Sequence, residues 1–114
     1  MSPSAISMFV FGIYVVFVGI GFLLIPNTLL PLFKFPKTEE PWIRVMGLIV
    51  AILGFYYIGA AQNELTIFFW MTVVGRFGIL IGFSLIVAFK KAKPMLIMFG
   101  LVDAAGAVWT LLTM

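Results

Sequence analysis

The chain has 114 residues, of which 64% are hydrophobic and only 10% are charged, whereas an average soluble domain has about 25% charged residues. A soluble domain of this length would leave too much of that apolar surface in water, so lipid must be its main solvent. The net charge of +3 comes with lysines that lie between apolar segments, and they form no basic patch of the kind that binds nucleic acid.

Four apolar runs are long enough to cross a bilayer core, which needs about 20 residues in a helix. In chain order they cover about 5–25, 42–62, 66–89 and 95–114. The first run has no basic segment before it, which argues against a cleaved signal peptide. Because runs of this length without alternation span lipid as helices, we expect an all-α fold. Residues 1–114 are predicted to form a single transmembrane domain, a four-helix bundle.

The connection 26–41 carries prolines at 26, 31, 36 and 41, which block a continuous helix. Its LLPLFKFP stretch is too apolar to stay in water. We expect an interfacial loop with Phe33 and Phe35 buried and Lys34 and Lys37 on phosphates. Glu39 and Glu40 precede the second span and are expected to cap its start, with Pro41 near the first turn.

The orientation follows from the loop charges. The first and third connections carry five lysines, and the side with residues 63–65 and both termini carries none. The lysines are Lys34, Lys37, Lys90, Lys91 and Lys93. The positive-inside rule predicts a multi-pass protein of the cell membrane with these loops in the cytoplasm and both termini outside. The short second and third connections predict antiparallel neighbours in the pairs 42–62 with 66–89 and 66–89 with 95–114.

Small residues recur near heptad spacing in every span and predict close helix packing, because lipid supplies no hydrophobic drive between helices. They are Gly12 and Gly19; Gly47, Ala51, Gly54 and Ala61; Gly75, Gly78 and Gly82; and Gly100, Ala104, Gly106 and Ala107. We interpret them as packing notches.

Two charges fall deep within spans. Arg76 lies ten residues into the third span, about 15 Å from its start, and Asp103 lies eight residues into the fourth, about 12 Å from its start. Each costs roughly 2.5–3.5 kcal/mol at a helix centre, which the apolar residues of its own helix outweigh. Neither charge is expected to face lipid, so each will seek a partner or water.

Three pairings stay open. Arg76 can reach Asp103, although their expected depths differ by about 8 Å. Asp103 can instead pair with Arg44, which leaves Arg76 to tyrosine, Gln62 or threonine, or a water or ligand can lie between the charges. Arg44, close to the membrane boundary, can equally snorkel to phosphate. The candidate ligand-binding residues or buried polar network are Arg76, Asp103, Arg44, Tyr56, Tyr57, Thr72 and Thr110.

The residue inventory limits the chemistry. The chain has no histidine and no cysteine, which removes disulfides, His or Cys metal sites, His-ligated haem and an imidazole base. We therefore expect no metal, no cofactor and no catalytic residues, and an enzyme is the least favoured class. Tyrosine, arginine and aspartate would suffice to bind a quinone, but no pattern demands one.

Length, span count and sparse buried charges make the whole chain resemble the DoxX-like small four-helix bacterial membrane proteins, many of unknown function. EPWIRVMG, GRFG and the aspartate of the fourth span look like a family signature. Small multidrug transporters have the same size but rely on a glutamate in the first span, which is uncharged here.

Two functions follow. The buried charges bind, or help to transport, a small polar or anionic molecule or a lipid; alternatively they lock helix packing in an accessory subunit of a membrane complex. In either case a bundle this small is expected to work as a homo-oligomer or with a partner membrane protein.

Overall fold

The computed structural model describes residues 1–89 and 95–114, which are helical with short connections. The elements are α1 Pro3–Leu24, α2 Pro26–Leu29, the 3-10 helix η1 Leu30–Phe33, α3 Trp42–Gln62, α4 Thr66–Ala88 and α5 Met95–Leu112. Four of them, α1, α3, α4 and α5, are long and apolar enough to cross a membrane. This confirms the all-α class and the presence of four candidate spans. The predicted lysine loop with Lys90, Lys91 and Lys93 lies outside the described residues.

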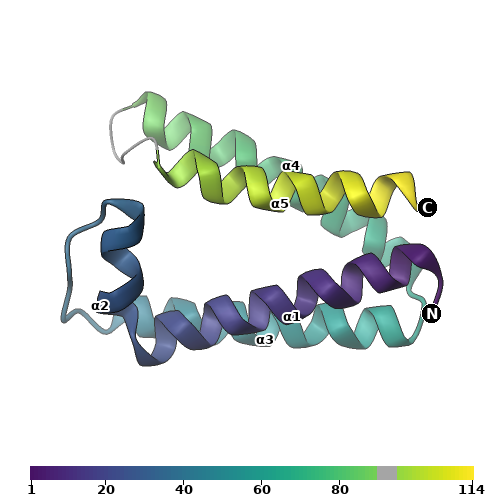
Figure 1. The fold of residues 1–114 in the computed structure, drawn as a ribbon, viewed down its shortest axis with the longest axis horizontal. Coiled ribbons are helices and arrows are strands. Elements are labelled where there is room, and N and C mark those ends of the chain that lie inside the picture. The colour runs from purple at the N-terminus through teal and green to yellow at the C-terminus, as the bar shows by residue number, and fades with distance from the viewer. Residues whose placement is uncertain (90–94) are drawn as a thin grey trace.

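The long helices form two pairs, α1 with α3 and α4 with α5. Figure 1 shows the pairs converging at the end that holds both chain termini and diverging toward the end that holds α2. At the convergent end, α1 also contacts α5 and α4. Buried side chains fill that end, among them Met8 and Phe11 of α1, Tyr57 of α3 and Phe69 of α4.

Glycines bring α1 and α3 into backbone contact. A Cβ built on Gly19 would lie 2.3 Å from the Ala51 nitrogen, and one built on Gly54 would lie 2.8 Å from the Gly12 oxygen. A Cβ on Gly47 would lie 2.7 Å from the Gly19 oxygen. Residues seven apart on each helix therefore face one another, and the predicted packing role of these glycines is confirmed.

The tight turn after α3 does not make α4 its main packing partner, contrary to the prediction from connection length. Tyr57 of α3 meets Phe68 of α4 edge-on near that turn, with ring centroids 5.7 Å apart. Beyond it, α3 packs on α1 and α4 packs on α5. The physical reason is that the glycines of α1 match those of α3, whereas α4 offers α3 no complementary notch.

The glycines of α4 are accordingly not notches within this chain. Apart from the nearby backbone of α4 itself, no atom of the described residues lies within 4 Å of a Cβ built on Gly75, Gly78 or Gly82. Gly100 and Gly106 of α5, in contrast, are close to Leu80 and Phe11 respectively. The packing interpretation therefore holds for α1, α3 and α5 and is wrong for α4 within the monomer.

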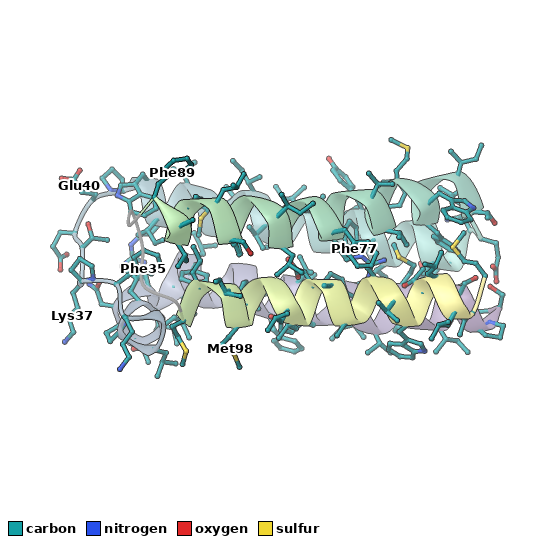
Figure 2. All side chains as sticks on the ribbon, turned by 90° about the horizontal axis from the view of Figure 1, so that it is seen from above. Phe35, Lys37, Glu40, Phe77, Phe89 and Met98 are labelled. Atoms are coloured by element: carbon teal, nitrogen blue, oxygen red, sulfur yellow. The ribbon has the colours of Figure 1, made fainter. Side chains whose placement is uncertain are left out.

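Residues 26–41 fold against the wide end of the helix pairs. The segment is partly helical, because Pro26 and Pro31 stand in first-turn positions where a missing N–H costs nothing. Leu30 is buried with Phe22 and Ile43, and Phe35 packs beside them. Lys37 and Glu40 project from this end (Figure 2). The side chain of Phe33 lies outside the description.

The glutamates before α3 do not cap it. The start of α3 has no side-chain cap, and Pro41 occupies the N-cap position. Glu39 instead accepts a hydrogen bond from Asn27, whose own oxygen accepts from the Thr38 amide. The Glu39 carboxylate therefore serves the connection rather than the helix start.

A polar clamp joins the start of α1 to the turn between α3 and α4. The Ser2 amide and hydroxyl donate to the two carboxylate oxygens of Glu64, at 2.6 and 2.7 Å. These bonds hold the pKa of Glu64 below its ordinary value of 4.5. Glu64 has φ 53°, a left-handed conformation that costs a non-glycine residue energy, so the clamp also stabilises the turn.

Candidate polar binding site

Arg76 is the centre of the buried polar groups. It lies in the middle of α4, is only 2% exposed, and its Cζ lies 4.7 Å from the Phe11 ring centroid. Its Nε donates to the Thr72 carbonyl at 3.2 Å. Nη2 donates to the Thr72 and Thr110 hydroxyls, each at 3.1 Å. The guanidinium therefore ties α4 to α5 and lies against an aromatic ring of α1.

The hydroxyls around Arg76 form a directed chain. Ser7 donates to the Ser4 carbonyl at 2.7 Å, which uses its only hydroxyl proton. Between Ser7 and Thr110, 2.7 Å apart, Thr110 must then be the donor. This leaves the lone pairs of Thr110 for Arg76. The chain thus runs from Arg76 through Thr110 and Ser7 to the backbone of α1.

One guanidinium nitrogen has no place in this chain. Nη1 of Arg76 is buried and makes no hydrogen bond to any described residue. It lies beside Gly106, where an added Cβ would be 3.3 Å away. Because a guanidinium carries five N–H groups, two of them, both on Nη1, are unsatisfied.

Arg76 forms part of the wall of a cavity of about 610 Å³ between the two helix pairs. Asp103, Tyr14 and Tyr57 contribute the other ionisable side chains of the wall. The remaining lining is apolar and extends to Trp42 at the start of α3. A cavity of this size, apolar with a few polar groups, is typical of a small-molecule site.

Of the seven predicted site residues, five lie together and two lie apart from them. Arg76, Thr72 and Thr110 are bonded together, and Tyr57 and Asp103 line the cavity with Arg76. Within the described residues, Asp103 forms no ion pair of 4.0 Å or less with either arginine.

Arg44 and Tyr56 lie away from this cluster. Arg44 is exposed, and its Nη1 donates to the carbonyls of Leu23 and Leu24, 2.5 and 3.4 Å away, at the end of α1. Tyr56 is exposed beside Phe55. Neither residue lines the cavity. Of the three open pairings, the structure shows the threonine partners of Arg76 and neither ion pair of Asp103.

The contribution of α1 was not predicted, because that span carries no charge. Ser7, Met8 and Phe11 all contact the Arg76 network, and Met8 Sδ lies 3.4 Å from Nη2. The available signal was the spacing of Ser4, Ser7 and Phe11, which puts two hydroxyls and a ring on one helical face.

Comparison with protein-family models, with curated proteins and with solved structures returned no match for this chain. The DoxX-like resemblance therefore stays a prediction. Among the described residues, no three acidic side chains gather in a way that could hold a metal ion. The site must be interpreted from its own geometry.

Proposed function

We propose that this protein binds a small polar or anionic group, or a lipid that carries one, within the membrane, and that Arg76 holds it. The observation that carries this proposal is the buried Nη1, which has no hydrogen-bond partner among the described residues. A buried donor left unsatisfied costs about 1–3 kcal/mol, and more when it is charged. Because Nη1 is enclosed beside Phe11 and Gly106, an oxygen of a ligand would reach it by displacing this packing, and would then remove that cost.

The surroundings of Arg76 support a ligand site. Arg76 shares its cavity with Asp103, Tyr14 and Tyr57, which can balance charge and donate hydrogen bonds. Ionisable groups within a membrane are expensive and usually line a site or pathway. Help in transport requires a second access route, and a homo-oligomer or partner protein would supply it.

The proposed topology places both termini outside the cell and the lysine-bearing connections in the cytoplasm, with consecutive spans antiparallel. It is supported by Lys34, which is exposed directly after η1, and by Lys37, which is exposed at the end of the molecule that Figure 2 labels. Cytoplasmic connections are enriched in lysine and arginine.

A second candidate function is that of an accessory subunit, in which the charges lock helix packing. The hydrogen bond from Arg76 to the Thr110 hydroxyl favours it, because it joins α4 to α5. In that case the arginine contributes to the fold and no ligand is required.

Native mass spectrometry of the detergent-purified protein separates the two functions. We would compare the wild type with Arg76→Leu and with Arg44→Leu, which removes the same charge outside the cavity. Circular dichroism would verify that each variant is folded. Ligand binding predicts a bound small molecule or lipid that is retained by Arg44→Leu and lost from a folded Arg76→Leu protein.

The accessory function predicts different results in the same experiment. A wild type without ligand, together with an Arg76→Leu protein that unfolds or dissociates, would refute the binding proposal and favour the accessory role. Arg76→Lys adds a second comparison, because it keeps the charge but lacks the planar fork of donors. If the site requires that fork, the lysine variant folds and still loses the ligand.

A further inference from the structure

We propose that the ligand is a single-chain amphiphile drawn from the bilayer, with an anionic oxygen head at Arg76 and its hydrocarbon chain along the cavity toward Trp42. This inference rests on the proposed function and names its ligand class. It is carried by the distribution of polar and apolar groups, the opening of the cavity and the missing partner of Nη1.

The cavity has a polar end and an apolar remainder. Arg76, Asp103, Tyr14 and Tyr57 are its ionisable side chains, and Arg76 and Tyr57 both pack against Phe11. Toward α2 the wall consists of aliphatic and aromatic side chains. These include Val18, Phe22, Leu30, Phe35, Ile43 and Met46. A wholly polar ligand would leave this length of the cavity unfilled, whereas a hydrocarbon chain matches it.

The cavity opens sideways to the surroundings between α3 and α4. Met46 and Leu53 of α3 and Ile79 of α4 line it and are nevertheless 36%, 41% and 39% exposed. Gly75 of α4 lines it as well, and no described atom beyond the nearby backbone of α4 lies within 4 Å of a Cβ built there. Because α3 and α4 pack on other partners, a chain can enter from lipid without crossing water.

The charge of the ligand's head group is inferred from the missing counter-ion of Arg76. No carboxylate of a described residue lies within 4.0 Å of the guanidinium, so its charge has no direct counter-ion there. Nη1 offers two N–H donors. One oxygen of a carboxylate can accept from Nη1 and the group supplies the opposite charge, and charge-assisted bonds of this kind are stronger than neutral ones.

The length of the cavity fits a lipid chain. Tyr57, near the head, and Trp42, at the far end, are separated by fifteen residues of α3 (42 to 57), which is about 22 Å. One leaflet of hydrocarbon is about 15 Å thick, half of a core of about 30 Å. A chain of that length covers most of the distance from the head to Trp42. A helix of a second copy, about 10–12 Å in diameter, could lie along the opening but could not reach Nη1 between the converging pairs.

Fluorescence quenching tests the position of the chain. Trp70→Phe and Trp109→Phe would leave Trp42 as the only tryptophan. This protein, in detergent, would be titrated with hexadecanoic acid brominated either at the chain end or beside the carboxyl group. We expect saturable quenching of Trp42 by the chain-end isomer and loss of that quenching with the carboxyl-side isomer.

Three further variants complete the test. Arg76→Leu should abolish the saturable quenching. Val50→Phe, which enlarges an apolar side chain of the cavity wall and changes no polar group, should abolish it too. Ile49→Phe is the matched control, because Ile49 is exposed and does not line the cavity; it should quench like the parent.

The outcomes separate this inference from the proposed function. If Val50→Phe retains an Arg76-dependent ligand in native mass spectrometry and the chain-end isomer does not quench saturably, the site binds a small polar group and the amphiphile is refuted. Equal quenching by both isomers also refutes the orientation. If the wild type and Arg76→Leu behave alike in both assays, the proposed function itself fails.

Discussion

Replacing Gly19 with alanine tests whether backbone contact holds α1 to α3. The new Cβ would lie 2.3 Å from the Ala51 nitrogen, 1.1 Å closer than the 3.4 Å at which ordinary contact begins. The obstacle is backbone, so no rotamer change relieves it and the helices must separate. Overpacking of this kind costs about 1–3 kcal/mol, and we expect the upper part of that range.

Gly78→Ala is the matched control, because a Cβ there meets no atom within 4 Å. Alanine improves helix propensity over glycine by up to about 1 kcal/mol at either position. The difference between the two variants cancels this gain and isolates the steric cost. We therefore expect the unfolding free energy of Gly19→Ala to lie about 2–3 kcal/mol below that of Gly78→Ala.

The assay is reversible unfolding in bicelles or mixed micelles, followed by far-UV circular dichroism. Within about 0.5 kcal/mol the two variants would count as equal, since that is the usual spread of inert surface changes. Equality would mean that the Gly19–Ala51 approach contributes nothing specific. The pairing of α1 with α3 would then need another cause.

Three further predictions concern the ends of the helices and the site. Lowering the pH through the depressed pKa of Glu64 should release its hydrogen bonds to Ser2. The stabilisation from these bonds is complete above the ordinary pKa of 4.5 and disappears below the pKa of Glu64 in the folded protein. Carboxyl NMR shifts measure this titration, and a midpoint at the ordinary pKa would contradict the clamp. Arg44→Leu removes the hydrogen-bond donor to the carbonyls at the end of α1 and should lower the free energy of unfolding by about 1 kcal/mol. Amide hydrogen exchange at the end of α1 should become faster, and an unchanged rate would show that Arg44 does not stabilise this helix end. Gly106→Ala puts a Cβ 2.7 Å from Phe11 Cδ2 and 3.3 Å from Arg76 Nη1, so their packing must shift and ligand retention should fall; full retention would show that this packing is unimportant for binding.

The spans could be predicted from hydropathy alone, since about 20 apolar residues with few charges leave lipid and helix as the consistent choice. Which helices pack against one another could not be predicted from the sequence. Short connections favoured α3 beside α4, yet complementarity between the glycines of α1 and α3 decided the contact. Small residues on every span make several pairings possible, and only three-dimensional fit selects one.

The residues of the candidate site were likewise only partly predictable from the sequence. Arg76 was identifiable because a buried cation is conspicuous, and Thr72 followed from its spacing on the same helix. Ser7, Met8 and Phe11 were not identified, since hydroxyl, thioether and phenyl groups are ordinary in an uncharged span. The expected depth mismatch of about 8 Å between Arg76 and Asp103 made a direct ion pair difficult, but the sequence left that pairing open beside two others.

Two substitutions in the hydroxyl chain test whether Arg76 depends on Thr110 as its hydrogen-bond acceptor. Thr110→Val removes an acceptor of Nη2 and should cost more than Ser7→Ala, which leaves only the Thr110 hydroxyl proton to find another acceptor. Such a proton can turn to a carbonyl of its own helix. A buried charged donor has no such alternative, so we expect about 1–3 kcal/mol for Thr110→Val. For Ser7→Ala we expect about 0.6 kcal/mol, the average for polar contacts between spans.

The unfolding assay used for Gly19 measures both variants. In an Arg76→Leu background the penalty of Thr110→Val should largely vanish, because the donor that it strands is gone. A penalty that persists there would show that Thr110 stabilises the protein without Arg76. A larger cost for Ser7→Ala than for Thr110→Val would refute the inference that the buried guanidinium depends on Thr110 as its acceptor.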